Sequence, residues 1–232
     1  MMIDDVMREP PTGSHPAREV LDREMREIRD DVLRMGSMVV AALDEATEAL
    51  TQGDRERATG VIRDDIRINE MQASILVHIA ATIATQAPVA RDLRYLLALD
   101  RVTYELERMG DHAASVAKQG LRLAGNVPPA ASRLRDIGRI AGELVSEVLR
   151  ALVDIDEAQA RVVAARDDEV DHRYREAFDQ TMAWLRADPE RVPDGISILF
   201  AAHDIERVGD RATNIAEDVV FLASGRIEDL NP

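Results

Sequence analysis

The chain has 232 residues, of which 46% are hydrophobic and only 3% aromatic. This composition favours long helices over a β-sandwich and argues against wholesale disorder. The formal net charge of −15, from 29 Lys and Arg against 44 Asp and Glu, argues against direct binding to nucleic acid or to anionic membranes. The absence of cysteine excludes disulfides, thiolate metal sites and thiol nucleophiles.

The N-terminal residues 1–17, with PPTG and HP, have no apolar core, so we expect a loose tail and not a signal peptide. Turn signals divide the rest of the chain into apolar-periodic segments, none of which shows the alternation of a strand. The expected helices span residues 19–52, 55–85, 89–123, 131–154, 157–186 and 193–224. Met71–Ala90 carries no formal charge, but its polar residues predict a buried helix ending in a turn, without direct membrane insertion.

These segments fall into two matching sets of three. With an offset of 102 residues, the second helix lies over the fifth, which pairs Asp65 with Asp167. With an offset of 99, ELERMGDHAASVA lies over DIERVGDRATNIA. We therefore predict an all-α fold of two tandem antiparallel three-helix bundles. The predicted units are a tail at 1–17, a first repeat at 18–124, a linker at 125–132, a second repeat at 133–225 and a C-terminal tail at 226–232.

Both third helices place two carboxylates four residues apart, Glu107 with Asp111 and Glu206 with Asp210. Like charges at this spacing repel on a helix, at a cost of roughly 0.2–0.5 kcal/mol per pair. Each pair lies beside the apolar stripe of its helix. Taken alone, each pair is consistent with a solvated face whose charge is offset by neighbouring arginines. The duplication indicates that the spacing has a function.

The second and fifth helices each add an acid within their apolar rhythm, Asp65 and Asp167. Each has a polar companion one turn later, Asn69 or Asp171. A partly buried carboxylate needs a cationic side chain, a metal ion or a hydrogen-bond donor as its partner. A structural ion pair is one alternative, and the chain offers arginines for it: Arg63 and Arg67 near Asp65, and Arg166 near Asp167.

A metal ion is the other alternative, because oxygen-only clusters suit hard or borderline cations. We expect one site per repeat, where the third helix meets the second, for iron, manganese, magnesium or zinc. The expected ligands are Asp167, Glu206 and Asp210 in the second repeat and Asp65, Glu107 and Asp111 in the first. Further candidates are Asn69, Asp100, Asp171, His203 and Asn214.

The chain resembles the PhoU family, accessory regulators of bacterial phosphate transport. The resemblance rests on four motifs in order: QAPVARDLRYLL at 86–97, ELERMGDHAASVAK at 105–118, DDEVDHRY at 167–174 and HDIERVGDRATNIAEDVVFLASG at 203–225. It implies a pair of three-helix bundles, with metal clusters held by E(D)xxxD motifs that match residues 107–111 and 206–210. Lys118 stands where the second repeat has Glu217, so we expect the first site to be weaker.

The resemblance further implies a cytoplasmic, usually dimeric protein. Its partners would be the ATPase subunit of a phosphate ABC transporter and a sensor histidine kinase, and it would repress the phosphate-starvation response when phosphate is plentiful. The chain has no Gly-rich phosphate loop, no nucleophile beside a base and no cofactor fingerprint, which favours a regulator over an enzyme. Two alternatives are a metal-free helical scaffold and a ferritin-like di-iron oxidase. The oxidase needs two inward Glu-x-x-His motifs, and the chain offers Glu169 with His172.

Overall fold

The structure is a computed structural model that describes residues 16–123, 127–128 and 131–230. These ranges contain no strand, and their helices are α1 (Pro16–Gln52), α2 (Arg55–Gln86), α3 (Arg91–Arg122), α4 (Ser132–Asp154), α5 (Glu157–Ala187) and α6 (Val192–Ser224), with a 3₁₀ turn, η2 (Pro189–Arg191), before α6. The all-α prediction is confirmed, and every predicted helix end lies within three residues of the observed one. The predicted tail lies outside the described residues up to residue 15, as does much of the predicted linker.

Equivalent aspartates begin the second helix of each repeat. Asp54 and Asp156 have extended backbone angles, and their side chains accept hydrogen bonds from the backbone N–H groups of Arg57 and Gln159. Such a cap satisfies one of the unpaired N–H groups at a helix start and contributes about 1 kcal/mol. The matching turn sequences therefore form matching turns.

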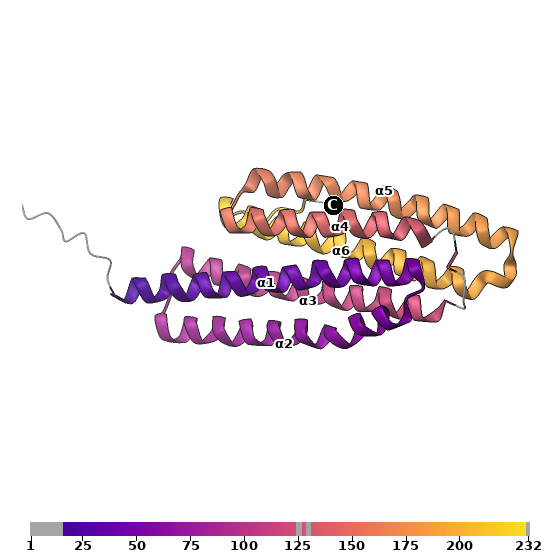
Figure 1. Ribbon diagram of the computed structural model, residues 1–232. Coiled ribbons are helices and arrows are strands. Elements are labelled where there is room, and N and C mark those ends of the chain that lie inside the picture. The colour runs from indigo at the N-terminus through magenta and orange to yellow at the C-terminus, as the bar shows by residue number, and fades with distance from the viewer. Residues whose placement is uncertain (1–15, 124–126, 129–130, 231–232) are drawn as a thin grey trace, which may run out of the picture.

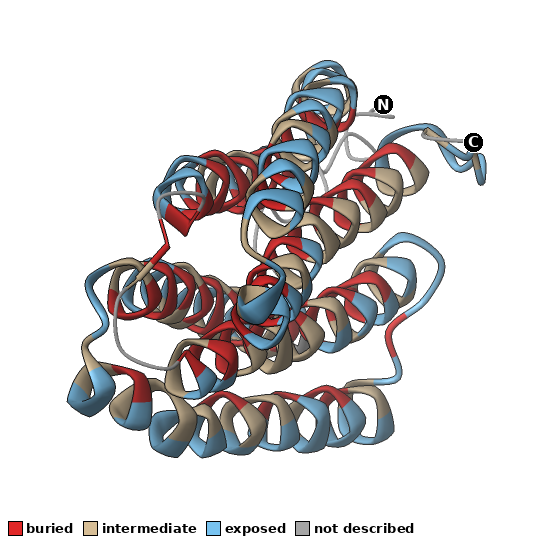
Figure 2. Ribbon diagram, turned by 90° about the vertical axis from the view of Figure 1, so that its right-hand side faces the viewer, coloured by how far each residue is buried: buried red, intermediate tan, exposed pale blue. Residues whose placement is uncertain are grey.

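The third helix of each repeat lies at the centre of the molecule. α3 packs on α1, α2 and α6, while α6 packs on α3, α4 and α5. α2 and α5 are outer helices on opposite sides of the bundle (Figure 1). Buried positions face inward on each helix (Figure 2). The apolar stripe predicted for the last helix is fully buried at Ile198, Ala201, Ile205, Val208, Ala212, Ile215 and Val219.

The contact between α3 and α6 is polar and duplicated. Asp204 on α6 accepts a hydrogen bond from Ser115 Oγ (2.6 Å) and lies 3.0 Å from His112 Nδ1. The same offset of 99 residues generates the second set: Glu105 on α3 accepts from Arg211 Nη1 (3.0 Å) and from Asn214 Nδ2 (3.2 Å). Each repeat therefore supplies one acid and two polar partners to the other, which joins the two bundles through two-fold related contacts.

The C-terminal segment lies against the second repeat as far as it is described. Gly225 ends α6 with a φ of 75°, in the left-handed region that favours glycine. Beyond it, Glu228 Oε2 accepts from Arg161 Nη2 on α5 (2.7 Å), and the backbone N–H of Leu230 donates to Glu217 Oε1 on α6 (3.0 Å). Across the described helices, none combines the length and apolar character needed to cross a lipid bilayer.

Candidate functional site

The second repeat brings four acidic side chains together between α5 and α6. Asp167 and Asp171 lie one turn apart on α5, and Glu206 and Asp210 lie one turn apart on α6. One carboxylate oxygen each from Asp171, Glu206 and Asp210 lie within 4.8 Å of one another. Oxygens bound to a single Mg²⁺ or Ca²⁺ lie about 2.0–2.6 Å from the ion, and hence at most about 5 Å apart. These three oxygens are therefore close enough to contact one cation. We call these four residues the second cluster.

Asp167 is the most buried member of the second cluster, with 1% of its surface exposed. Its Oδ2 accepts a hydrogen bond from Thr213 Oγ1 at 3.3 Å. Its Oδ1 lies against Gly209, and a Cβ atom added at residue 209 would collide with it. Glycine inside a helix costs about 1 kcal/mol relative to alanine. Gly209 therefore has a steric reason: it makes room on α6 for the buried carboxyl of α5.

Burial is the main cause of raised pKa values in the second cluster. It raises the pKa of Asp167 to about 7, and the nearby Asp210 and Asp171 add to the shift. Burial also raises the pKa of Glu206, where Asp210 adds to it, and the pKa of Asp210, where Arg207 opposes it. Desolvation and neighbouring negative charge both disfavour a carboxylate, and a nearby cation reverses the second effect.

The first repeat contains the equivalent arrangement with one carboxylate fewer. The first cluster consists of Asp65 and Asn69 on α2 and Glu107 and Asp111 on α3. Burial raises the pKa of Asp65 and of Glu107, and Asp111 raises both further. Lys118 lowers the pKa of Asp65, so a cationic side chain already offsets part of this charge. The three carboxylates of the first cluster do not bring one oxygen each within 4.8 Å, in contrast to the second cluster.

Both clusters contain buried oxygens that accept no hydrogen bond from the described part of the chain. These oxygens are Asp65 Oδ1, Asn69 Oδ1, Glu107 Oε2 and Glu206 Oε2. Glu107 Oε2 lies 3.6 Å from Arg108 Nε and Glu206 Oε2 lies 3.3 Å from His203 Nδ1, without hydrogen-bond geometry. A buried acceptor left without a donor costs about 1–3 kcal/mol. A cation would satisfy such oxygens, and an all-oxygen set suits magnesium, manganese, calcium or iron. The second cluster therefore fits a bound cation by its geometry and by its unsatisfied oxygen, and the first cluster by its unsatisfied oxygens alone.

Arginines on the same helices neutralise part of the exposed charge. Arg207 Nη1 lies 2.6 Å from Asp210 Oδ2, and Arg108 Nη1 lies 3.4 Å from Asp111 Oδ2. The two arginine side chains are 40% and 43% exposed. Ion pairs at such exposure contribute about 0–1 kcal/mol, so they are weak competitors for a multivalent cation.

Two of the arginines predicted as partners of Asp65 and Asp167 pair with other acids. Arg63 Nε donates to Asp64 at 2.9 Å, and Arg166 Nη1 donates to Glu147 on α4 at 2.6 Å. The structural ion-pair alternative is therefore better supported at Asp111 and Asp210 than at the half-buried Asp65.

The structure places some of the further candidate metal ligands in or beside the second cluster and others elsewhere. Asp171 belongs to the second cluster and also accepts from Arg175 Nη2 at 3.0 Å. His203 Nδ1 lies 3.3 Å from Glu206 Oε2, at the exposed edge of that cluster. His172 of the Glu-x-x-His motif is 66% exposed beside Glu176, so this motif does not face inward as a di-iron oxidase requires.

Two other candidates lie apart from the clusters. Asn214 donates to Glu105, so its amide belongs to the contact between α3 and α6. Asp100 is two helical turns, about 10 Å, before Glu107 on α3. It lines a different cavity, together with Arg101, Glu105 and Asp218.

Each cluster has a cavity beside it. A cavity of about 360 Å³ between α1 and α2 is lined by Asp65 and Gly110. A cavity of about 390 Å³ is lined by Asp210 and Glu217 on α6 and by Asp229 of the C-terminal segment. Asp229 was not among the predicted ligands, because it lies beyond the second repeat and has no counterpart in the first. Both cavities offer a small ion a route from solvent to the carboxylates.

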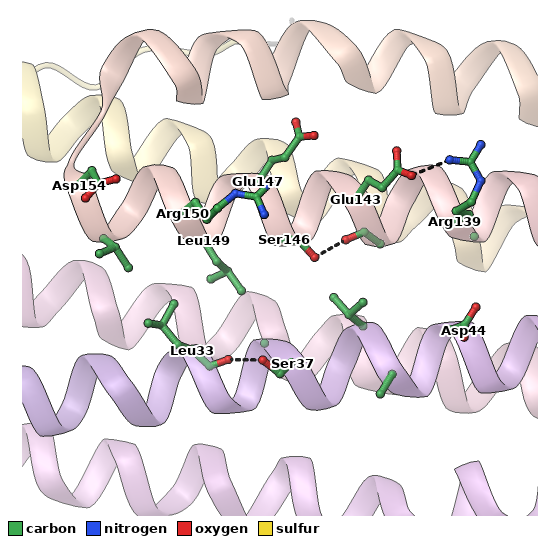
Figure 3. Close-up of a pocket in the computed structure, with 16 residues that line it drawn as sticks. Leu33, Ser37, Asp44, Arg139, Glu143, Ser146, Glu147, Leu149, Arg150 and Asp154 are labelled. Carbon is green, nitrogen blue, oxygen red and sulfur yellow. Dashed lines mark hydrogen bonds and ion pairs between the residues drawn. The ribbon is translucent and has the colours of Figure 1, made fainter.

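A further cavity, of about 770 Å³, lies between α1 and α4 and is away from both clusters (Figure 3). Its lining is mostly apolar and includes Leu33 and Leu149. Charged side chains along α4 pair with one another, as Arg139 does with Glu143. This cavity adds no residue to the candidate metal sites.

Comparison with known proteins decides the family. The PhoU domain family matches the chain twice, over residues 32–120 and 134–219. The chain belongs to the PhoU family. A phosphate-specific transport system accessory protein PhoU homolog from Xylella fastidiosa is 34% identical over 205 residues, which is 88% of this chain and 86% of the relative. The homolog from Pseudomonas aeruginosa is 31% identical over 214 residues, covering 91% of this chain and 88% of the relative.

Solved PhoU structures share the fold. The crystal structure of PhoU from Pseudomonas aeruginosa matches with a TM-score of 0.84 at 32% identity, covering 89% of this chain and 100% of that one. The phosphate transport system regulatory protein PhoU from Streptococcus pneumoniae matches with a TM-score of 0.84 at 30% identity, covering 90% and 99%. The two PhoU matches contain the two clusters, one in each, which confirms the predicted family and its two repeats.

Proposed function

We propose that this PhoU family member is a cytoplasmic, metal-binding regulator of phosphate uptake. It couples the ATPase subunit of the phosphate ABC transporter to a sensor histidine kinase and represses the phosphate-starvation response when phosphate is plentiful. Membership of a family whose relatives are named phosphate-specific transport system accessory proteins supports the role in phosphate transport. The proposed role is regulatory and not enzymatic, and the proposed assembly is a homodimer.

One observation carries the metal-binding part of the proposal: each repeat has a polar cluster between its outer and central helices with buried oxygens that accept no hydrogen bond. Asp171, Glu206 and Asp210 would hold the cation in the second repeat, with Asp167 behind them. Without a cation these carboxylates repel one another across α5 and α6. A bound cation supplies positive charge at that point, so the packing of the two helices should tighten.

Metal analysis and thermal unfolding test the metal-binding part. We expect purified protein to retain metal, and chelator-treated protein to gain stability when Mn²⁺, Fe³⁺, Mg²⁺ or Zn²⁺ is added, by about 4 kcal/mol at a thousand times the dissociation constant. Asp210→Asn should lose most of this gain while its metal-free melting temperature stays equal or rises. A metal-free scaffold held by the Arg207–Asp210 ion pair predicts the reverse: no metal dependence, and a lower melting temperature for the variant.

Pull-down experiments test the partners. The acidic surface should bind basic surfaces on the transporter ATPase and on the sensor kinase, and added salt should weaken both interactions. A protein that retains metal but captures neither partner at low salt would contradict the coupling role and leave metal binding intact. Binding to DNA at physiological salt without added metal would contradict the expected partner class.

A further inference from the structure

The outer side of α2 differs from the rest of the surface. No Asp, Glu, Lys or Arg occurs from residue 71 to residue 90, in a chain in which 31% of residues are charged. Among the described helices, α2 packs mainly on α1 and α3, and its remaining side faces solvent (Figure 1). The prediction of a buried helix from Met71 onward is therefore wrong on this side, because α2 is an outer helix of the bundle. Five exposed apolar residues on this side form what we call the α2 outer face: Ala73, Val77, Ala80, Ala81 and Ala84.

The equivalent side of α5 has an ordinary charged surface. The offset of 102 residues places Arg175, Asp179 and Arg186 of α5 where α2 has Ala73, Val77 and Ala84, and all six are exposed. The exposed side of an outer helix in this fold can therefore carry charged residues. The uncharged α2 outer face is a property of this one helix, and it is not required by the fold.

The one ionisable side chain in the uncharged stretch, His78, is directed away from the α2 outer face. Its Nε2 lies 2.8 Å from Glu24 Oε2 on α1. Val77, by contrast, is 68% exposed at the centre of the face. An exposed apolar strip bounded by charged residues is typical of a protein–protein contact.

We propose that the α2 outer face is the contact surface of a homodimer, in which α2 packs antiparallel on α2 of a second copy. This inference rests on the proposal above that the protein is a homodimer, and it names the surface. Each copy carries a formal charge of −15, so approach through charged surfaces brings like charges together. Contact through the α2 outer face brings no formal charge into the centre of the interface.

The order of residues on the α2 outer face suits a two-fold contact. Val77 is followed within two turns by Ala80, Ala81 and Ala84, so in an antiparallel pair the valine of each copy packs among the alanines of the other. Such self-complementarity is what a two-fold interface requires, and small residues let the helix axes approach closely. The same register places Glu70 near the end of the other copy's α2, beyond which Arg91 begins α3, so opposite charges meet at each end.

The size of the face determines the expected strength of the contact. Residues 71–86 of α2 extend about 24 Å, and a helix surface about 10 Å wide gives roughly 240 Å² per copy. Exposed Ile66 and Val89 enlarge the apolar area at its two ends. A standard stable interface buries about 800 Å² per partner. We therefore expect a dimer that dissociates on dilution.

Single-cysteine variants test the surface directly, because the chain has no cysteine of its own. Under mild oxidation, Ala80→Cys should form a disulfide-linked dimer in high yield, because this register places residue 80 of each copy nearest the two-fold axis. The control is Asp179→Cys on the exposed side of α5, which should remain largely monomeric. Light scattering provides the second measurement: Val77→Asp places the residue of α5 on α2 and should give the monomer mass of 25.7 kDa at concentrations where wild type is dimeric. The reciprocal Asp179→Val should leave the dimer unchanged, and circular dichroism checks that both variants fold.

Each outcome decides between the proposals. A wild-type protein that is monomeric at all concentrations contradicts the homodimer itself. A dimer that survives Val77→Asp and is not cross-linked through Ala80→Cys places the interface elsewhere and contradicts only the α2 surface. If Val77→Asp instead abolishes binding to the transporter ATPase or to lipid vesicles while wild type is monomeric, the face belongs to that partner and the inference fails.

Discussion

The two repeats share a scaffold and differ in charge. Both place a carboxylate pair on the central helix, an aspartate on the outer helix that is half-buried at Asp65 and buried at Asp167, and a glycine opposite that aspartate. The second repeat has Asp171 and Glu217 where the first has Asn69 and Lys118. The two repeats therefore have the same helix geometry but different numbers of carboxylates that could bind a cation. The extra acidic residues of the second repeat indicate a stronger cation site there, and this difference between the repeats can be tested.

The largest expected difference between the two repeats is their contribution to the pH dependence of stability in the metal-free protein. The pKa of Asp167 is raised from 3.8 to about 7, so between these values the unfolded chain ionises while the folded protein stays protonated. Stability should therefore fall as pH rises from about 4 to about 7, by at most roughly 4 kcal/mol, since one pKa unit equals about 1.4 kcal/mol.

Chelator-treated wild type and Asp167→Asn, unfolded by urea at pH 5 and pH 8, measure this difference. The variant should lose less stability between the two pH values, and Asp65→Asn in the first repeat should change the slope less. Identical slopes in wild type and Asp167→Asn would show that burial of this carboxyl does not govern the pH dependence.

The next expected difference concerns metal affinity. Titration of wild type by calorimetry should show a tighter and a weaker phase. Asp210→Asn should weaken the tighter phase about a hundredfold, and Asp111→Asn should weaken only the other, because ligand charge sets the affinity of all-oxygen sites. Equal affinities for the two phases would contradict a difference between the repeats. Loss of the tighter phase in Asp111→Asn would place the tighter site in the first repeat.

Alanine at the two glycines probes the scaffold. An added Cβ at residue 209 collides with Asp167 Oδ1, whereas at residue 110 it meets the flexible end of Ile68 at 3.0 Å and Asp65 Oδ1 at 3.4 Å. Overpacking costs about 1–3 kcal/mol, and replacing a helical glycine returns about 1 kcal/mol. Gly209→Ala should therefore destabilise by about 2 kcal/mol and Gly110→Ala by less than about 1 kcal/mol in thermal unfolding. A larger loss of stability in Gly110→Ala than in Gly209→Ala would mean that α2 and α5 pack on the central helices differently from this structure.

The smallest expected effect is an increase in the metal affinity of the first cluster. Asn69→Asp gives the first cluster the four carboxylates of the second and should raise its affinity about tenfold, as added ligand charge does in other oxygen sites. The background is Asp210→Asn, in which the second site is weakened, and calorimetry gives the affinity. Asp171→Asn in wild type is the reciprocal change and should lower the affinity of the second site by a similar factor. No gain from Asn69→Asp would show that geometry, and not charge count, limits the first site.

Much of this arrangement was predictable from local sequence. Apolar periodicity and capping aspartates determine where helices begin and end, because both act within one or two turns. The pairing of Asp65 and Asp167 with the acids of the central helices followed from the repeat offsets. Asp171 was a further candidate, and the structure brings it to the centre of the second cluster.

Other features were not predictable, although one left a signal. Glu105 and Asp204 are related by the offset of 99 residues, but nothing in either helix alone indicates that each binds the opposite repeat. That contact also explains why Asn214, which continues the polar line of α6, is directed towards α3.

The sequence by itself determined the helices, the duplication and the residue types of the two clusters, since these depend on neighbours three or four positions apart on one helix. Only the tertiary structure decided which oxygens meet, that the first cluster is more open than the second and that the C-terminal segment brings Asp229 beside Asp210. The physical reason is that contacts between helices distant in sequence depend on packing, and packing is a property of side chains from several helices together.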